Sequence, residues 1–518
     1  MEGNKQRQPE STMETNNNGI TNTPESNTSP QLPKCMQKLC ELLSEDPYPT
    51  DFQITILRVD DDDDDAATDE SDDKFVPLFI KDGTHLGFHA GDLPRFVGIV
   101  RKFYYDLRQK RRLGAFGDTV DSSFSSKIFD ELVMASTTCL LLCCPDHSTA
   151  WADRKRVLEC NADSIIDDMI CNETRFGNLL FTQHSKAPSS WSHRRWIHQR
   201  RRNYNYSEHV IDANASIMNQ YTACERFLDY VKSEVEICDR VASSFPKNYY
   251  AWTYRIVVVR DFVRNICDLS DKRCIVLGFK LLQNEIKIIE NKWLTRHVSD
   301  HSASHYGTMV LRLLVDLNFN SLSFCTESIR SMLKYVFGRI EFIRPIIASF
   351  PSHEVLWKYR RMNISTYMYL LDRLLDQCLS GEAKDELNDL GFLINDIGIK
   401  TEIYNNFSSE IKMSLCCFDN FESSMTARKG ILDAAELNHA RINSYTYLFW
   451  LSALLQASTA TNKYLMGIGN GDLSRLLEVK EYLVDLTDKR LINHNFFRKS
   501  KSIGIGEIAI QSKNEKDY

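Results

Sequence analysis

Apolar residues recur at steps of three and four along most of the chain from about residue 126 onward. This spacing places them on one face of an α-helix, so the pattern predicts a helical protein. The clearest stripe predicts a helix of about six turns that ends before Pro246, because proline cannot continue a helix. The stripe comprises Ile217, Tyr221, Cys224, Leu228, Val231, Val235 and Cys238.

A second stripe begins directly after this proline. It starts at about Asn248–Tyr249 and continues through Trp252, Ile256 and Val259. Two helices joined by a short turn that contains proline form an antiparallel helical hairpin.

The sequence at this turn occurs several times in the chain. PKNYYAWTYR, at 246–255, has proline six residues before tryptophan and arginine three residues after it, and the same offsets recur at 145–154 and 351–360. A copy at 185–194 keeps tryptophan and arginine but moves the proline. A degenerate copy at 299–308 is expected to have His305 in place of tryptophan and Thr308 in place of arginine.

These repeats predict an all-α fold, an α-α superhelix in which stacked hairpins form a solenoid. Their uneven spacing matches neither the tetratricopeptide nor the ankyrin repeat. We expect tryptophan to fill the gap between hairpins and arginine to bind a carboxylate or carbonyl of a neighbouring helix. The predicted structural residues are Trp151, Arg154, Trp191, Arg194, Trp252, Arg255, Trp357 and Arg360.

The remaining segments differ in character. Residues 1–34 are polar and predicted to be disordered, and the region 35–125 contains a predicted strand at 52–59 and an acidic disordered insert at 60–73. The helical repeats are expected over 126–460, with a weak additional pair near 435–456, and a C-terminal helix and polar tail over 461–518.

Composition narrows the function. The net charge of −7 disfavours a general nucleic-acid binder, and no apolar stretch reaches the length of a membrane span. The 15 scattered cysteines form no CxxC pair, and the N-terminus lacks the apolar core of a secretory signal, so we expect a reduced, cytoplasmic protein. No catalytic triad, phosphate-binding loop or carboxylate pair is visible.

Two clusters leave alternatives open. His297, His301 and His305 would share one helix face, yet three turns are too long a span for one metal ion, so a polar junction or subunit contact is the favoured interpretation and no metal site is predicted. The basic and aromatic stretch 193–202 fits RNA, a diphosphate or a partner protein. The basic run at 101–112 is typical of a solvated helix face.

The repeated turns resemble the signature repeat of protein prenyltransferase α subunits, over roughly 140–370. The strings SKAPSSWSHRRW at 185–196 and HVSDHSASHY at 297–306 are similar to those of a divergent branch of that family. The resemblance implies a crescent of helical hairpins wrapped around a β subunit, which holds the catalytic zinc and the isoprenoid pocket. No cofactor is expected on this chain itself.

The resemblance also implies site residues. Lys186, five residues before Trp191, corresponds to the lysine that reaches the prenyl diphosphate, and Lys247, Tyr249 and Tyr250 correspond to substrate-binding positions. An exposed turn residue is the alternative for the lysines, and a core or subunit-interface role is favoured for the tyrosines. The chain departs from the family pattern at Ala187 and Pro188, which puts the geometry around Lys186 in question.

The resemblance therefore predicts the α-type subunit of a heterodimeric protein prenyltransferase, which would be active only together with a β partner. Its expected partners are a β subunit, with that of the Rab geranylgeranyl transferase as the candidate, a prenyl diphosphate (geranylgeranyl implied by the branch) and a protein that offers a cysteine thiol. The alternatives are a non-catalytic helical-repeat adaptor and, with less support, an RNA-binding solenoid.

Overall fold

The computed structural model describes residues 31–56, 71–72, 74–113, 122–160, 166–209, 217–267, 269, 271–321, 326–379, 443 and 447. Over these residues the chain is mainly helical, and the predicted all-α solenoid of antiparallel hairpins is confirmed. Residues 1–30, most of the predicted acidic insert and the whole predicted C-terminal helix and tail lie outside the described residues.

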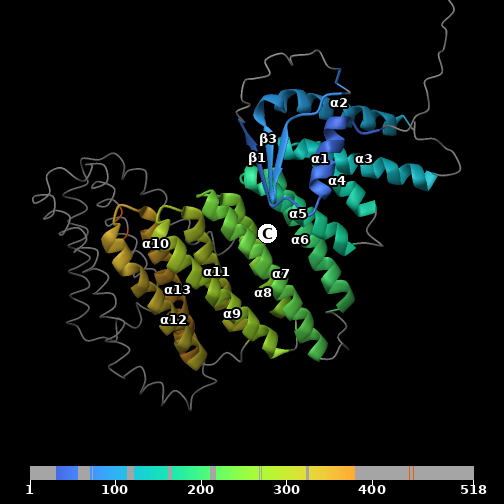
Figure 1. The fold of residues 1–518 in the computed structure, drawn as a ribbon. Helices are drawn as coiled ribbons and strands as arrows, with labels where there is room; N and C mark the ends of the chain where they lie inside the picture. Colours follow the sequence, from blue (N-terminus) through green and yellow to red (C-terminus); the bar gives the residue numbers. More distant parts are fainter. Residues whose placement is uncertain are drawn as a thin grey trace, which may run out of the picture.

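Within the described residues five helical hairpins stack in chain order, and Figure 1 shows them side by side from teal to orange. Each consists of a first helix, a short turn and an antiparallel second helix. The hairpins are α3 (Ser122–Cys143) with α4 (Ser148–Cys160), α5 (Ile166–Gln183) with α6 (Pro188–His209), α7 (Ile217–Ser244) with α8 (Tyr249–Cys267), α9 (Lys272–Ile288) with α11 (His301–Ser321), and α12 (Thr326–Ser349) with α13 (Glu354–Leu379).

The fourth hairpin is interrupted before its turn. A π-helical turn, η2 (Ile289–Trp293), and the short α10 (Leu294–Arg296) follow α9. A π-helical turn accommodates one extra residue within a helix, which shifts the register of the residues on either side.

A small mixed sheet precedes the hairpins. It comprises β1 (Asp51–Thr55), β2 (Phe79–Asp82) and β3 (His85–His89) in the order β1-β3-β2, with β1 parallel and β2 antiparallel to β3. The predicted strand at 52–59 is present as β1, but the sequence analysis missed β2 and β3. Both are short, and the Asp82-Gly83 step between them, with Gly83 at φ +56°, is the hairpin signal that was overlooked.

The sheet covers the first hairpins together with α1 (Lys34–Ser44) and α2 (Leu93–Arg112), which follows the short 3₁₀ turn η1 (Ala90–Asp92). Phe52 and Phe88 are buried on its inner face. The edge strand β1 is fixed to α5, because the Phe52 amide donates to Thr182 Oγ1 at 2.9 Å.

Two main apolar cores result. One joins the sheet, α1 and α2 to α3 and the beginning of the repeats, and the other runs from Phe181 and Trp191 through the later hairpins to Leu370. No helix in the described part of the chain is both long and apolar enough to cross a membrane.

Candidate functional site

All five hairpin turns share one backbone pattern and lie in register. In each turn, the backbone amide that follows the first helix donates to the carbonyl four residues earlier. The residue three positions after this amide opens the second helix. The residues that open the second helices are His147, Ala187, Asn248, Asp300 and His353.

The repeat tryptophans lock these turns. Each lies four residues after the opening residue, and the indole Nε1 of Trp151, Trp191 and Trp357 donates to the carbonyl six residues earlier at 2.7–2.8 Å. Trp252 is the exception, because its buried Nε1 has no hydrogen-bond partner among the described residues. The equivalent carbonyl, that of Pro246, accepts the Lys186 ammonium at 3.3 Å instead.

The repeat arginines join each hairpin to the next. Every one donates Nη1 to the carbonyl twenty residues earlier, on the first helix of its own hairpin. Three of them also bind a glutamate on the first helix of the following hairpin; the pairs are Arg154–Glu173 (2.7 Å), Arg194–Glu234 (2.8 Å) and Arg255–Glu285 (2.7 Å).

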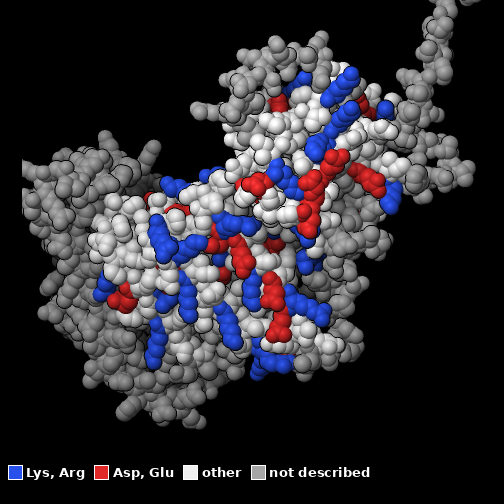
Figure 2. All heavy atoms as spheres, viewed as in Figure 1, with Lys and Arg blue, Asp and Glu red and all other residues white. Residues whose placement is uncertain are grey.

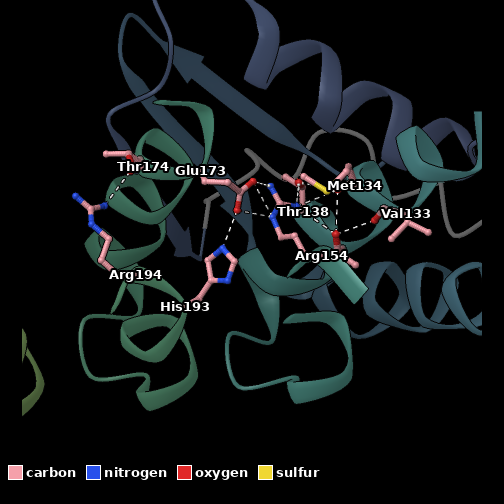
Figure 3. Close-up of polar contacts among 9 residues, drawn as sticks. Val133, Met134, Thr138, Arg154, Glu173, Thr174, His193 and Arg194 are labelled. Carbon is pink, nitrogen blue, oxygen red and sulfur yellow. Dashed lines mark hydrogen bonds and ion pairs between the residues drawn. The ribbon is translucent and has the colours of Figure 1, made fainter. Parts of the chain in front are cut away.

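Each of these glutamates has a second donor from its own hairpin. Figure 3 shows both Arg154 and His193 pointing toward the Glu173 carboxylate, with His193 Nε2 at 2.9 Å. Burial alone raises the pKa of this carboxyl, but Arg154 and the His193 hydrogen bond outweigh it and lower the pKa to about 2. The same opposition leaves the pKa of Glu234 below its ordinary value.

The register of the fourth repeat differs from the prediction. Asp300 opens α11, its Oδ1 accepting the Ser302 amide at 3.0 Å, and Ser304, not His305, lies four residues later. Tyr306 then takes the place of Tyr254 in the previous hairpin and donates to Glu285 as Tyr254 does to Glu234. The prediction was wrong by one residue because an eroded repeat has no tryptophan to fix its register.

The fourth repeat therefore lacks both the tryptophan and the arginine of the other repeats. Its arginine position is Gly307, where a Cβ would come within 2.8 Å of the Ile289 side chain. At the next junction Arg339 of α12 stands where α5 and α7 carry glutamate, eleven residues before the turn, and it pairs at 2.6 Å with Glu290 of the π-helical turn. The polarity of the pair is thus reversed at this junction.

The predicted substrate lysines lie on adjacent turns. Lys186 precedes α6 and Lys247 precedes α8, and both are exposed. Lys247 has a left-handed backbone (φ +59°), a costly conformation for a residue with a side chain. Its amide is held by Asp300 Oδ2 at 3.1 Å, so the strained turn is tied to the fourth hairpin.

The two predicted tyrosines differ in exposure. Tyr249 is 62 % exposed at the first residue of α8, whereas Tyr250 is half-buried and packs against the main core. Only Tyr249 presents most of its ring to a ligand or partner at this edge. The N-termini of α6 and α8, which carry partial positive charge, begin at the same edge.

Asn248 and Asp300 are two polar residues of the turns whose roles the sequence analysis missed. Asn248 is fully buried, donates Nδ2 to the Ser185 carbonyl at 2.8 Å and accepts the Ala251 amide. Both residues are of types that open helices, a signal available at those positions. Together with the Lys186 contact to Pro246, they connect the second, third and fourth turns into one row.

The weak sixth pair predicted near 435–456 lies mostly outside the described residues. Its two described members nevertheless contact the fifth turn: Asn443 Nδ2 donates to the Ser352 carbonyl at 3.0 Å, and the Tyr447 ring centroid is 5.2 Å from that of Trp357.

The basic stretch 193–202 is partly structural. His193, Arg194 and His198 are buried, and only part of the stretch faces outward. Of the three predicted histidines, His297 lies in the turn, while His301 and His305 are exposed on α11. Among the residues the structure describes, no group of three or more histidine, cysteine or acidic side chains could hold a metal ion.

Comparison with known proteins extends the observations on the repeats. The family model for the protein prenyltransferase alpha subunit repeat matches residues 231–262, which span the turn between α7 and α8. The chain is 30 % identical over 250 residues to protein prenyltransferase alpha subunit repeat-containing protein 1 of Danio rerio, covering 45 % of this chain and 54 % of that protein.

Two further relatives give the same result. The human protein of that name is 29 % identical over 256 residues (45 % of this chain, 58 % of the relative), and protein 1-B of Xenopus laevis is 30 % identical over 255 residues (45 % and 54 %). The match thus spans just over half the length of these relatives. The predicted resemblance to the protein prenyltransferase α-subunit family is confirmed, and the chain carries the repeat that gives the family its name.

Proposed function

We propose that this chain is the α-type subunit of a heterodimeric protein prenyltransferase and that the row of turns around Lys186 and Lys247 faces the diphosphate of the isoprenoid substrate. The observation that carries the proposal is the position of Lys186. Its ammonium reaches across to the next turn, 3.3 Å from the Pro246 carbonyl, while the side chain stays exposed beside the N-termini of α6 and α8.

The chemistry assigned to this chain is electrostatic. In prenyl transfer the thiolate sulfur of a protein cysteine bonds to the first carbon of the isoprenoid as the carbon–oxygen bond to diphosphate breaks. Lys186 would leave Pro246 and neutralise the charge that develops on the departing diphosphate, with Lys247 and the helix N-termini adding to the positive potential.

The other parts of the reaction belong to the partner. The zinc ion that presents the thiolate and the isoprenoid pocket are assigned to a β subunit, with that of the Rab geranylgeranyl transferase as the first candidate and geranylgeranyl as the candidate group. Tyr249, exposed beside Lys247, would border the isoprenoid or the β subunit.

We propose a cytoplasmic location for the protein. The proposed activity is tested by reconstituting the complex with a β subunit. The full chain is co-expressed with candidate β subunits, the complex is isolated by gel filtration, and labelled geranylgeranyl transfer to a cysteine-containing protein is measured. Lys186→Ala is expected to lower turnover about tenfold or more without affecting assembly, because one positioned charge on the leaving group is lost.

Lys280→Ala, which removes an exposed lysine on α9, is the matched control and should leave turnover unchanged. Normal turnover of Lys186→Ala in an intact complex would remove the role assigned to this lysine.

A non-catalytic helical-repeat adaptor is the second candidate. It is favoured by Ala187, which opens α6 without a capping side chain, and by the use of Lys186 to join two turns. A stable complex with a β subunit that transfers no prenyl group would support this alternative.

A further inference from the structure

A group of cationic side chains lies outside the network of repeat arginines. Lys155 on α4, Arg195 on α6, and Arg260 and Arg264 on α8 belong to the second helices of three successive hairpins; we call these four residues the cationic cluster. The first three are half-buried and Arg264 is exposed. Helix α6 packs against both α4 and α8, so the cluster crosses contiguous helices.

The three arginines of the cluster lack the ion-paired glutamate that most of the repeat arginines have. Arg194 and Arg255 each bind a glutamate, whereas Arg195, Arg260 and Arg264 form no ion pair with any described residue. The Nε atoms of Arg195 and Arg260 are buried without a hydrogen-bond partner in the described part of the chain. Buried polar atoms are usually satisfied. Arg339 has the same kind of Nε but is paired with Glu290, whereas Arg195 and Arg260 have neither an Nε hydrogen bond nor an ion pair with a described residue.

The charges within the cluster also act on one another. Burial lowers the pKa of Arg260, and the neighbouring positive charges of Arg264 and Arg195 lower it further, with Asp261 opposing them. Burial likewise lowers the pKa of Lys155, with Glu159 opposing it. An anion at this surface would relieve the repulsion, and the half-buried position of the cations would strengthen its attraction.

The cluster is distinct from the row of turns. Arg195 is seven residues into α6 and Arg264 fifteen residues into α8, which places them roughly 10 and 22 Å along the helices from the turns. The face drawn in Figure 2 differs from the cluster, because lysine and arginine side chains lie among carboxylates over α7.

The surroundings favour carboxylates over nucleic acid. Trp196, next to Arg195 on α6, already stacks on His193 (centroids 5.4 Å apart) and lies near the cations of Lys155 (5.7 Å) and Arg200 (5.3 Å), so a base could stack on it only by displacing one of these neighbours. Arg200, at the border of the cluster, is paired with Glu159 at 2.6 Å. The net charge of −7 also opposes a long polyanion.

We propose that the cationic cluster on α4, α6 and α8 is a docking surface for a carboxylate-rich segment of a partner protein. The inference does not rest on prenyl transfer and holds equally for an adaptor.

The test measures binding of a fluorescein-labelled glutamate-rich peptide to the full chain by anisotropy at low ionic strength. A glutamine-for-glutamate peptide and an oligouridylate of similar length are the comparison probes. We expect salt-sensitive binding of the acidic peptide only, weakened about tenfold by Arg195→Gln combined with Arg260→Gln, since both substitutions remove charge from the contact.

The matched control combines Lys280→Gln with Lys287→Gln, which removes two exposed charges from α9 and should leave the affinity unchanged. Circular dichroism establishes that both variants fold. Equal loss in both variants, or absence of peptide binding, would overturn the proposal. Preferential binding of the oligouridylate that depends on Arg195 and Arg260 would instead assign the surface to RNA.

Discussion

At the scale of the residue, the same carboxyl group behaves differently according to the donors around it. Glu173 has a buried arginine and a histidine, and its pKa falls to about 2. Glu290 is equally buried but pairs with the partly exposed Arg339 and the Tyr359 hydroxyl. Burial prevails there over these two donors, and the pKa of Glu290 rises from 4.5 to about 7. The reversed ion pair between Glu290 and Arg339 is therefore weaker than the other ion pairs that join neighbouring hairpins.

Glu290 should make the stability of the protein depend on pH. Because the folded state holds this proton more tightly than the unfolded state, the contribution of Glu290 to stability falls as the pH rises from about 4.5 to about 7, by at most roughly 3 kcal/mol. Urea unfolding of the wild type and Glu290→Gln across this range measures it, and the difference between them should change by this amount.

Glu341→Gln, which alters a partly exposed carboxylate of the same helix as Arg339, should run parallel to the wild type. Parallel curves for Glu290→Gln as well would show that folding does not raise the pKa of Glu290.

At the scale of the element, the sequence predicted those hairpin turns whose positions depend on side-chain volume and on the geometry of the chain. Tryptophan and arginine at a fixed offset located four of the five turns, three of them with proline at a fixed offset as well, since those residues fill the same space each time. The fourth turn was predicted one residue too late, because Ser304 and Gly307 stand where the other repeats have tryptophan and arginine. The π-helical turn before it adds a residue that leaves no pattern in the sequence. The glutamate partners were not predicted, because they lie 19 to 40 residues from their arginines and only packing brings them together.

Alanine substitutions at two helical glycines should distinguish the effect of packing on stability from that of helix propensity. Gly307→Ala should destabilise the protein by about 1–3 kcal/mol, since its Cβ would meet the Ile289 side chain at 2.8 Å and Tyr359 at 3.2 Å. Gly338→Ala, on α12 with open space around it, should stabilise by up to about 1 kcal/mol. Thermal unfolding midpoints measure both, and a gain in each variant would mean that the fourth junction can relax.

At the scale of the whole molecule, the two apolar cores divide a single stack. The sheet, α1 and α2 cover the first hairpin and bury Phe52, Phe88 and Phe96, whereas the later hairpins share a core of their own. In a stacked array each unit contacts mainly its neighbours, so stability need not be uniform along the chain. The row of turns lies along the second core, and the sheet contacts the second hairpin through β1 and α5.

The division into two cores predicts which helices lose stability when one core is disrupted. Phe88→Ala should remove about 3–5 kcal/mol from the first core, because a fully buried ring leaves a cavity between the strands and α2. Amide hydrogen exchange should then accelerate about a hundredfold in α2 and α3 while α8 and α11 keep their protection. Val310→Ala, in the second core on α11, is the matched substitution and should give the opposite distribution. Uniform acceleration in both variants would show that the stack opens as one cooperative unit, and the row of turns would then depend on the sheet as much as on its own hairpins.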